Sequence, residues 1–223
     1  MVIVWLVEKE MSDNQNKMLQ VFQALKKTYP DVKYYLDFKT PLDLLVATIL
    51  SAQARDEAVN EVTKELFKHY KKAGDYAKAS VDDLLKYVGK LSFAGNKSKN
   101  IIAACKILAE AYDGQVPKDI NTLVELPGIG RKTAIVILTN AFDIVPGVAV
   151  DTHVIRVSYR LGWTRQKNPE KIEEDLNNLI PEKNWKEIQW LLKAHGRAIC
   201  RAQVPFCSEC SVEKLCPKAG VAK

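Results

Sequence analysis

Residues 126–134 read Leu-Pro-Gly-Ile-Gly-Arg-Lys-Thr-Ala. A helical segment is predicted to end at the Pro-Gly turn, and a second helix is predicted to begin directly after Gly130. Gly128 and Gly130 allow backbone angles that a Cβ atom would forbid. The free N–H groups and the positive dipole end of the second helix then face whatever approaches the turn. A phosphate suits such a close approach, so we interpret Pro127, Gly128, Gly130 and Arg131 as a phosphate grip.

Lys132 lies in the first turn of that second helix. One interpretation is a surface lysine that makes one more phosphate contact. The other is chemical, because the helix dipole and Arg131 disfavour the ammonium form and leave an amine that can form a Schiff base. The downstream segment Val-Asp-Thr-His, residues 150–153, supplies a carboxylate at Asp151. Asp151 is expected to cap the next helix, and a rigid, ionised cap can also act as a general base or stabilise a cation.

Composition indicates an ordinary globular protein. The 223 residues are 47% hydrophobic and 27% charged, with a net charge of +6 that permits a polyanionic partner. No apolar run approaches the roughly 20 residues that span a bilayer. Residues 2–7 are apolar but too few, and we expect a packed or frayed terminal extension there. An intracellular protein with no membrane association is expected.

The apolar periodicity is helical almost throughout, and no sustained alternation typical of strands occurs. Thr40 and Pro41 are typical of a helix start, and Asp56 is expected to cap the following helix. The bend at residues 144–147 marks the best internal boundary. These patterns predict an all-α fold. Helices are expected near residues 18–25, 41–50, 56–67, 80–88, 97–112, 119–126, 130–142, 151–161, 169–180 and 185–199.

Four of the five cysteines lie near the C-terminus, at Cys200, Cys207, Cys210 and Cys216. The spacing C-x6-C-x2-C-x5-C favours a compact [4Fe–4S] site over zinc, which usually takes two close pairs, and over disulfides. The fifth, Cys105, is predicted to be buried.

Basic residues lie close to these cysteines. Lys193, His195 and Arg197 are expected to bring positive charge to the cluster. Arg201, in the loop after the first cysteine, either offsets the charge of the cluster or contacts a phosphate.

Together, these motifs resemble the endonuclease III type of DNA glycosylase in the helix-hairpin-helix superfamily. The sequences Leu-Ser-Ala-Gln-Ala at residues 50–54 and His-Gly-Arg at residues 195–197 also match, so the resemblance covers nearly all of the chain after about residue 15. It implies two helical lobes and a [4Fe–4S] cluster. A six-helix barrel with the hairpin would occupy residues 34–144, and residues 1–33 with 145–223 would form the iron–sulfur domain.

The resemblance also implies a mechanism. A damaged base is flipped out of the duplex, Lys132 attacks the deoxyribose C1′, and the imine undergoes β-elimination while Asp151 assists. Gln53 would fill the gap in the duplex, although a helix-end glutamine inside the protein is the structural alternative. Phe93 would be the apolar wedge, with Leu91 as the alternative. His153 either contacts DNA or makes a structural hydrogen bond.

The leading hypothesis is a bifunctional DNA glycosylase and AP lyase that excises oxidised pyrimidines. Its partner would be double-stranded DNA containing damaged bases or abasic sites, bound by a monomer. The alternatives are a monofunctional mismatch or uracil glycosylase, and a non-catalytic iron–sulfur protein that binds DNA. Lys132 argues against the first, and the joint presence of Lys132 and Asp151 argues against the second.

Overall fold

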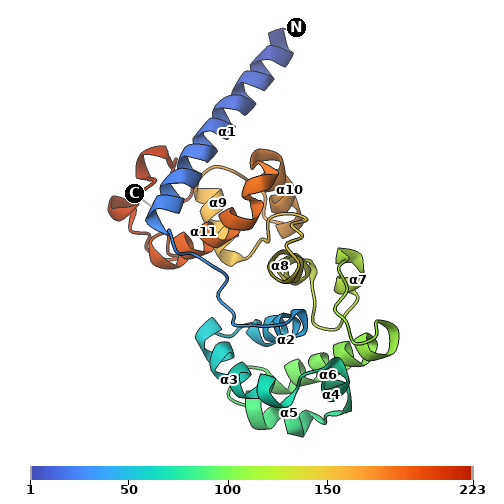
Figure 1. Ribbon diagram of the computed structural model, residues 1–223. Coiled ribbons are helices and arrows are strands. Elements are labelled where there is room, and N and C mark those ends of the chain that lie inside the picture. Colours follow the sequence, from blue (N-terminus) through green and yellow to red (C-terminus); the bar gives the residue numbers. More distant parts are fainter. Residues whose placement is uncertain (1, 222–223) are drawn as a thin grey trace. The chain divides into compact units, whose positions relative to one another are not determined.

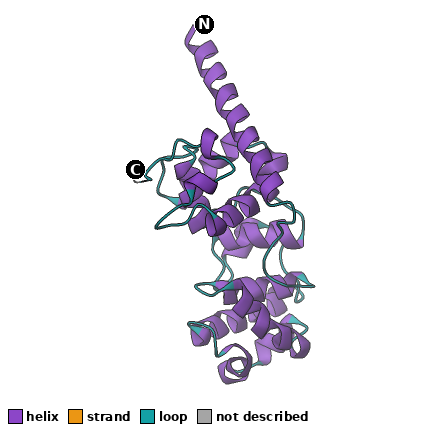
Figure 2. Cartoon of the chain, turned by 90° about the vertical axis from the view of Figure 1, so that its left-hand side faces the viewer, coloured by secondary structure: helices purple, strands orange, loops and turns teal. Residues whose placement is uncertain are grey.

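The computed structural model describes the backbone of residues 2–221 and the side chains of residues 13–221. All regular elements in that part of the chain are helices, which confirms the predicted all-α class (Figure 1, Figure 2). No helix among the described residues is long and apolar enough to cross a membrane. The α-helices are α1 (Val2–Thr28), α2 (Pro41–Ser51), α3 (Asp56–His69), α4 (Ala73–Lys78), α5 (Val81–Val88), α6 (Ala94–Ala111), α7 (Ile120–Val124), α8 (Arg131–Ala141), α9 (Thr152–Arg160), α10 (Pro169–Leu179) and α11 (Trp185–Ala198). Three short 3-10 helices are η1 (Glu182–Asn184), η2 (Cys207–Glu209) and η3 (Glu213–Leu215).

The chain divides into two compact units. The central unit comprises Tyr34–Pro146 and contains α2 to α8. The terminal unit joins Met1–Lys33 to Gly147–Lys223 and contains α1, α9, α10 and α11. Each unit has its own apolar core.

In the central unit, α2 is almost wholly buried, and its apolar side chains belong to the core. Its start is fixed by a capping box between two side chains. Asp43 N–H donates to Thr40 Oγ1 at 3.1 Å, and Thr40 N–H donates to Asp43 Oδ2 at 3.0 Å. Pro41 occupies the first helical position, as predicted, where its missing N–H costs nothing.

In the terminal unit, α1 contributes one buried apolar stripe. Its members are spaced three and four residues apart, so they share one helix face. The helix ends before Pro30, as predicted. The stripe consists of Met18, Val21, Phe22 and Leu25. The side chains of residues 2–7 lie outside the described part, so their packing stays a prediction.

Several helices differ from the prediction, and the largest difference is that α1 begins at Val2, well before the predicted residue 18. α6 begins at Ala94 rather than Lys97, because Phe93 forms the N-cap with a left-handed backbone. The cap of α3 is the extended Arg55, and Asp56 is the first helical residue. There its carboxylate still faces the positive end of the helix dipole. The six-residue α4 was not predicted, because so short a helix shows no clear periodicity.

Candidate active site

The predicted turn between two helices connects α7 to α8. It is closed by one backbone hydrogen bond, in which Ile129 N–H donates to the Leu126 carbonyl at 3.0 Å. Both side chains are buried in the core of the central unit. Pro127 between them is half-buried. The turn is therefore anchored by its apolar residues, while its other residues face outward.

The two glycines of the turn serve different purposes. Gly128 has φ +84°, and a Cβ atom there would lie 3.0 Å from Nδ2 of Asn100. Gly130 was expected to need a special backbone, but its φ of −93° and ψ of 173° are open to any residue. No described atom lies within 4 Å of where its Cβ would be, and no side chain caps α8. The missing side chain thus leaves the N–H groups of α8 accessible to an anion.

Arg131 and Lys132 are the first two residues of α8, and both are exposed. The first turn of this helix contains no acidic residue. Because Cβ atoms tilt toward the helix N-terminus, both side chains start out toward the open end of α8. The turn therefore combines free N–H groups with two cationic side chains.

Asp151 caps α9, as predicted. Its Oδ1 atom accepts the N–H groups of His153 at 2.8 Å and Val154 at 2.9 Å. Within the described residues, Oδ2 has no hydrogen-bond partner, and the residue is half-buried. One carboxylate oxygen is thus committed to the cap and the other is available. Lys132 belongs to the central unit, whereas Asp151 belongs to the terminal unit.

Four exposed residues of the central unit other than glycine have left-handed backbones, namely Gln53, Phe93, Asp113 and Asp143. Gln53 follows α2 with φ 52°, and Phe93 precedes α6 with φ 56°. This conformation costs a residue with a Cβ atom about 1–2 kcal/mol, and such strain tends to gather at functional sites. Phe93 is 63% exposed, whereas Leu91, the other candidate wedge, is 7% exposed and belongs to the core. Gln53 and Phe93 are therefore available for insertion into a partner, and Leu91 is not.

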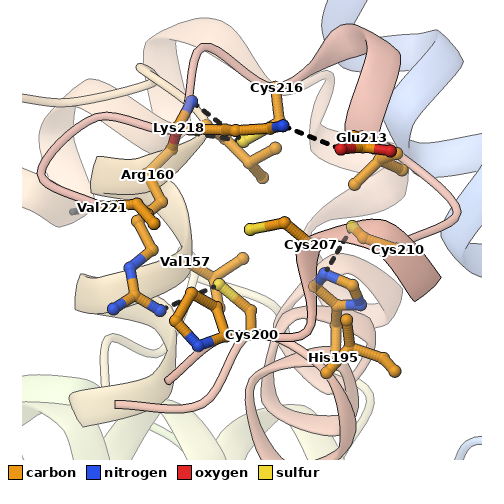
Figure 3. Close-up of a pocket in the computed structure, with 14 residues that line it drawn as sticks. Val157, Arg160, His195, Cys200, Cys207, Cys210, Glu213, Cys216, Lys218 and Val221 are labelled. Carbon is orange, nitrogen blue, oxygen red and sulfur yellow. Dashed lines mark hydrogen bonds and ion pairs between the residues drawn. The ribbon is translucent and has the colours of Figure 1, made fainter. Parts of the chain in front are cut away.

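The four C-terminal cysteines line one pocket of the terminal unit, just after α11 (Figure 3). Three of their sulfur atoms lie near hydrogen-bonding nitrogens. Arg160 Nη1 donates to Cys200 Sγ at 3.4 Å, and Lys218 N–H donates to Cys216 Sγ at 3.3 Å. His195 Nε2 lies 3.5 Å from Cys210 Sγ. Burial raises the pKa of the Cys210 and Cys216 thiols, whereas backbone N–H groups that donate to their sulfurs lower it.

The chemistry of these four thiols fits an iron–sulfur cluster. A [4Fe–4S] cubane takes one thiolate on each of its four irons, and four cysteine side chains line this pocket. Donors aimed at the sulfurs also suit an iron–thiolate cluster. The residues present therefore fit the cluster.

His195 does not bring positive charge to the cysteines, contrary to the prediction. It is buried, and burial lowers the pKa of its ring to about 4. The ring is therefore neutral at pH 7, and its Nδ1 lies 3.1 Å from the Tyr29 hydroxyl. Sequence reasoning missed this because burial depends on the packing of α1 against α11.

Two arginines on α9, which the sequence analysis did not single out, hold the loop that carries the first cysteine. Arg160 donates to the carbonyls of Arg201 at 2.6 Å and Ala202 at 3.0 Å. Arg156 donates through Nε to the Cys200 carbonyl at 2.9 Å. Arg156 and Arg160 are four residues apart in the helix that follows Asp151, so they lie on one face of it. This spacing is the sequence signal that could have identified them.

Arg201 itself is exposed and lies 4.6 Å above the Phe206 ring. The stacking on Phe206 and a hydrogen bond from Nε to the Ala198 carbonyl at 3.2 Å hold the guanidinium in one orientation, and its Nη groups can donate to a partner. Arg201 can therefore meet a phosphate without a large loss of side-chain entropy.

Comparisons with known proteins agree with these features. Residues 46–182 match the family model described as HhH-GPD superfamily base excision DNA repair protein. Endonuclease III of Synechocystis sp. is 44% identical over 95% of this chain and 96% of its own length. Endonuclease III of Escherichia coli K12 is 37% identical over 91% of this chain and 96% of its own length.

Solved structures agree as well. A trapped covalent intermediate of endonuclease III with DNA matches with a TM-score of 0.86 and 38% identity, over 92% of this chain and 96% of that one. A thermostable thymine-DNA glycosylase shares the fold, with a TM-score of 0.83 at 19% identity over 93% of this chain and 97% of that one. The chain therefore belongs to the endonuclease III family, within the HhH-GPD superfamily of base excision DNA repair proteins.

Proposed function

We propose that Lys132 and Asp151 carry out the glycosylase and AP lyase reactions of this protein. As a member of the endonuclease III family, the chain is a bifunctional DNA glycosylase and AP lyase of base excision repair. The observation that carries the assignment of Lys132 is its exposed position on the uncapped first turn of α8, directly after the glycine turn. The related endonuclease III that was trapped in covalent linkage to DNA supports attack by such a nucleophile.

In the proposed reaction, the Lys132 amine attacks C1′ of the damaged nucleotide. The C1′–N bond breaks, and the base leaves with its electron pair. The nitrogen loses one proton, and the C1′–O4′ bond then breaks while O4′ takes up a proton, so that C1′ and Nζ form a protonated imine. Removal of a proton from C2′ then expels the 3′ phosphate with the C3′–O electron pair, which nicks the strand. The free Oδ2 of Asp151 would stabilise the positive charge on the sugar.

The lesion must leave the duplex before this attack, because C1′ cannot be reached within the stack. Phe93 would wedge between neighbouring bases, and Gln53 would offer hydrogen bonds to the orphaned base. We propose oxidised pyrimidines as substrates and a monomer as the active species.

The grip on the strand would come from both units. In the central unit, Pro127, Gly128, Gly130 and Arg131 present backbone and cationic donors at the start of α8. In the terminal unit, His153 and Arg201 would contact phosphates. Such contacts fix the register of the protein on the duplex without reading sequence. The central unit would then be the barrel domain with the hairpin, and the terminal unit the iron–sulfur domain.

We assign a [4Fe–4S] cluster to Cys200, Cys207, Cys210 and Cys216. When bound, the cluster would cross-link the C-terminal loops by thiolate ligation. Arg160 and Arg156 then hold the loop that carries Arg201 in position against α9. A brown protein that contains iron and sulfide is expected, and a colourless protein with one zinc ion would contradict the assignment.

Borohydride trapping on a duplex with an abasic site tests the nucleophile. The wild-type protein is expected to form a covalent adduct, and Lys132→Gln is expected to form none. Lys64→Gln, an exposed lysine of the same unit, is the matched control and should trap normally. If the wild type releases bases without forming an adduct, the protein is monofunctional. If it neither releases bases nor nicks DNA, it only binds.

A further inference from the structure

An arginine fixes which nitrogen of His153 carries the proton. Arg156 Nη2 lies 3.2 Å from His153 Nδ1. A guanidinium can only donate hydrogen bonds, so Nδ1 must be the unprotonated acceptor. The ring proton then lies on Nε2, and the ring is neutral.

Arg156 has little freedom to move away from this ring. The same Nη2 donates to the Gly196 carbonyl at 2.8 Å, and Nε donates to the Cys200 carbonyl at 2.9 Å. Gly196 leaves room for this close packing of α11 against α9. A Cβ atom there would lie 3.0 Å from His153 Cβ and Nδ1, and 3.2 Å from Arg156 Nη2.

The surroundings of the ring also oppose a charged form. Burial lowers the pKa of His153, and the positive charges of Arg156, Arg197 and Lys193 lower it further. Asp151 alone acts in the opposite direction. A neutral ring with a fixed tautomer agrees with this balance.

We propose that Arg156 is a positioning residue that presents His153 to DNA as a neutral Nε2–H donor. This rests on the proposed DNA-binding role of His153. Next to it, Asp151 is only an acceptor, so the start of α9 offers two complementary groups. The carboxylate suits the positively charged sugar, and the Nε2–H group suits a phosphate oxygen of the damaged strand.

Long-range proton–nitrogen NMR of the 15N-labelled holoprotein tests the tautomer. The chain has three histidines, so His153→Gln identifies the signals of this ring. In the wild type, we expect an unprotonated Nδ1 and a protonated Nε2 at pH 7. Arg156→Gln is expected to give a mixture of tautomers, whereas the exposed Arg165→Gln should change nothing.

A wild-type ring protonated on Nδ1 or on both nitrogens would overturn the proposal. So would an unchanged Nε2–H ring in Arg156→Gln. The iron content of each variant shows that the cluster is retained, which separates lost positioning from lost folding.

The role of the donor is tested with a duplex that carries an uncleavable tetrahydrofuran site. His153→Gln and Arg156→Gln are each expected to weaken binding roughly tenfold, as the loss of one hydrogen bond to a charged group predicts. The double variant should be no weaker, because both changes remove the same contact. If the losses of binding add up in the double variant, or if His153→Gln binds normally, the proposed role of His153 and Arg156 is overturned. Trapping by Lys132 is scored separately, so failure here leaves the proposed reaction untouched.

Discussion

The left-handed backbone of Phe93 costs conformational energy, and its exposed side chain gains little stability from burial in the core. It exposes 63% of its surface, and its φ of 56° lies in the left-handed region. An aromatic ring in water next to a strained backbone contributes nothing to folding that a smaller residue could not supply. This exposure suits the proposed insertion of Phe93 between bases.

Phe93→Ala should consequently affect DNA more than stability. Base release from a duplex is expected to fall about tenfold or more, because the lost wedge stabilised an unstacked step. The melting temperature should change by no more than about 2–4 °C, since little buried area is lost. Single-turnover assays and thermal denaturation measure the two effects. Tyr112→Ala, an exposed aromatic residue at the other end of α6, is the control. Equal release rates for wild type and Phe93→Ala would rule out the wedge.

At the scale of elements, the two glycines of the turn between α7 and α8 have different expected roles. We expect Gly128 to matter for folding and Gly130 to matter for DNA binding. Gly128→Ala must accept a positive φ and a contact with Asn100, so we expect it to lower the free energy of unfolding by about 1–3 kcal/mol. Gly130→Ala adopts an ordinary extended backbone with space around it, so stability should change little. Its methyl group, however, stands before the N–H groups of α8 and should weaken DNA binding. Denaturant unfolding and DNA titration of both variants check this, and a reversed pattern would contradict it.

The link between α9 and the cysteine loop belongs to the same scale. Arg160 is 8% exposed and donates to two backbone carbonyls and one sulfur. Arg160→Met should lower the free energy of unfolding by about 3 kcal/mol, because buried acceptors lose a charged donor. Iron content should fall as well, since Cys200 loses its neighbour. Arg165→Met is the exposed control. An unchanged iron content would show that the cysteines alone hold the cluster.

At the scale of the molecule, a net charge of +6 favours association with DNA whatever its sequence. The logarithm of the binding constant should fall linearly with the logarithm of salt concentration, with a slope set by the number of phosphates contacted. Arg201→Gln should reduce that slope by about one if this side chain neutralises one phosphate. Lys64→Gln should leave it unchanged. An unaltered slope for Arg201→Gln would assign Arg201 to charge balance near the cluster instead.

Most helices could be predicted because their signals are local. Pro41 after Thr40, the apolar stripe from Met18 to Leu25 and the glycine turn each act within a few residues. The short α4 and the early start of α6 could not be predicted. α4 is too short to show a helical periodicity. α6 begins directly after Phe93, and an aromatic residue rarely adopts the left-handed backbone that Phe93 has at this N-cap.

The sequence by itself determined the all-α class, the turn that ends at Gly130 and the candidate pair Lys132 and Asp151. These follow from periodicity, from the backbone freedom of glycine and from residue chemistry, none of which needs distant contacts. The tertiary structure alone decided which of Leu91 and Phe93 is exposed.

Tertiary packing also decided the states of the histidines. His195 is neutral because α1 and α11 bury it. His153 and Arg156 are neighbours on one face of α9, but Arg156 is held in place by the carbonyls of Gly196 and Cys200. Burial and these carbonyl contacts join residues that lie far apart in the chain, so no local pattern encodes them.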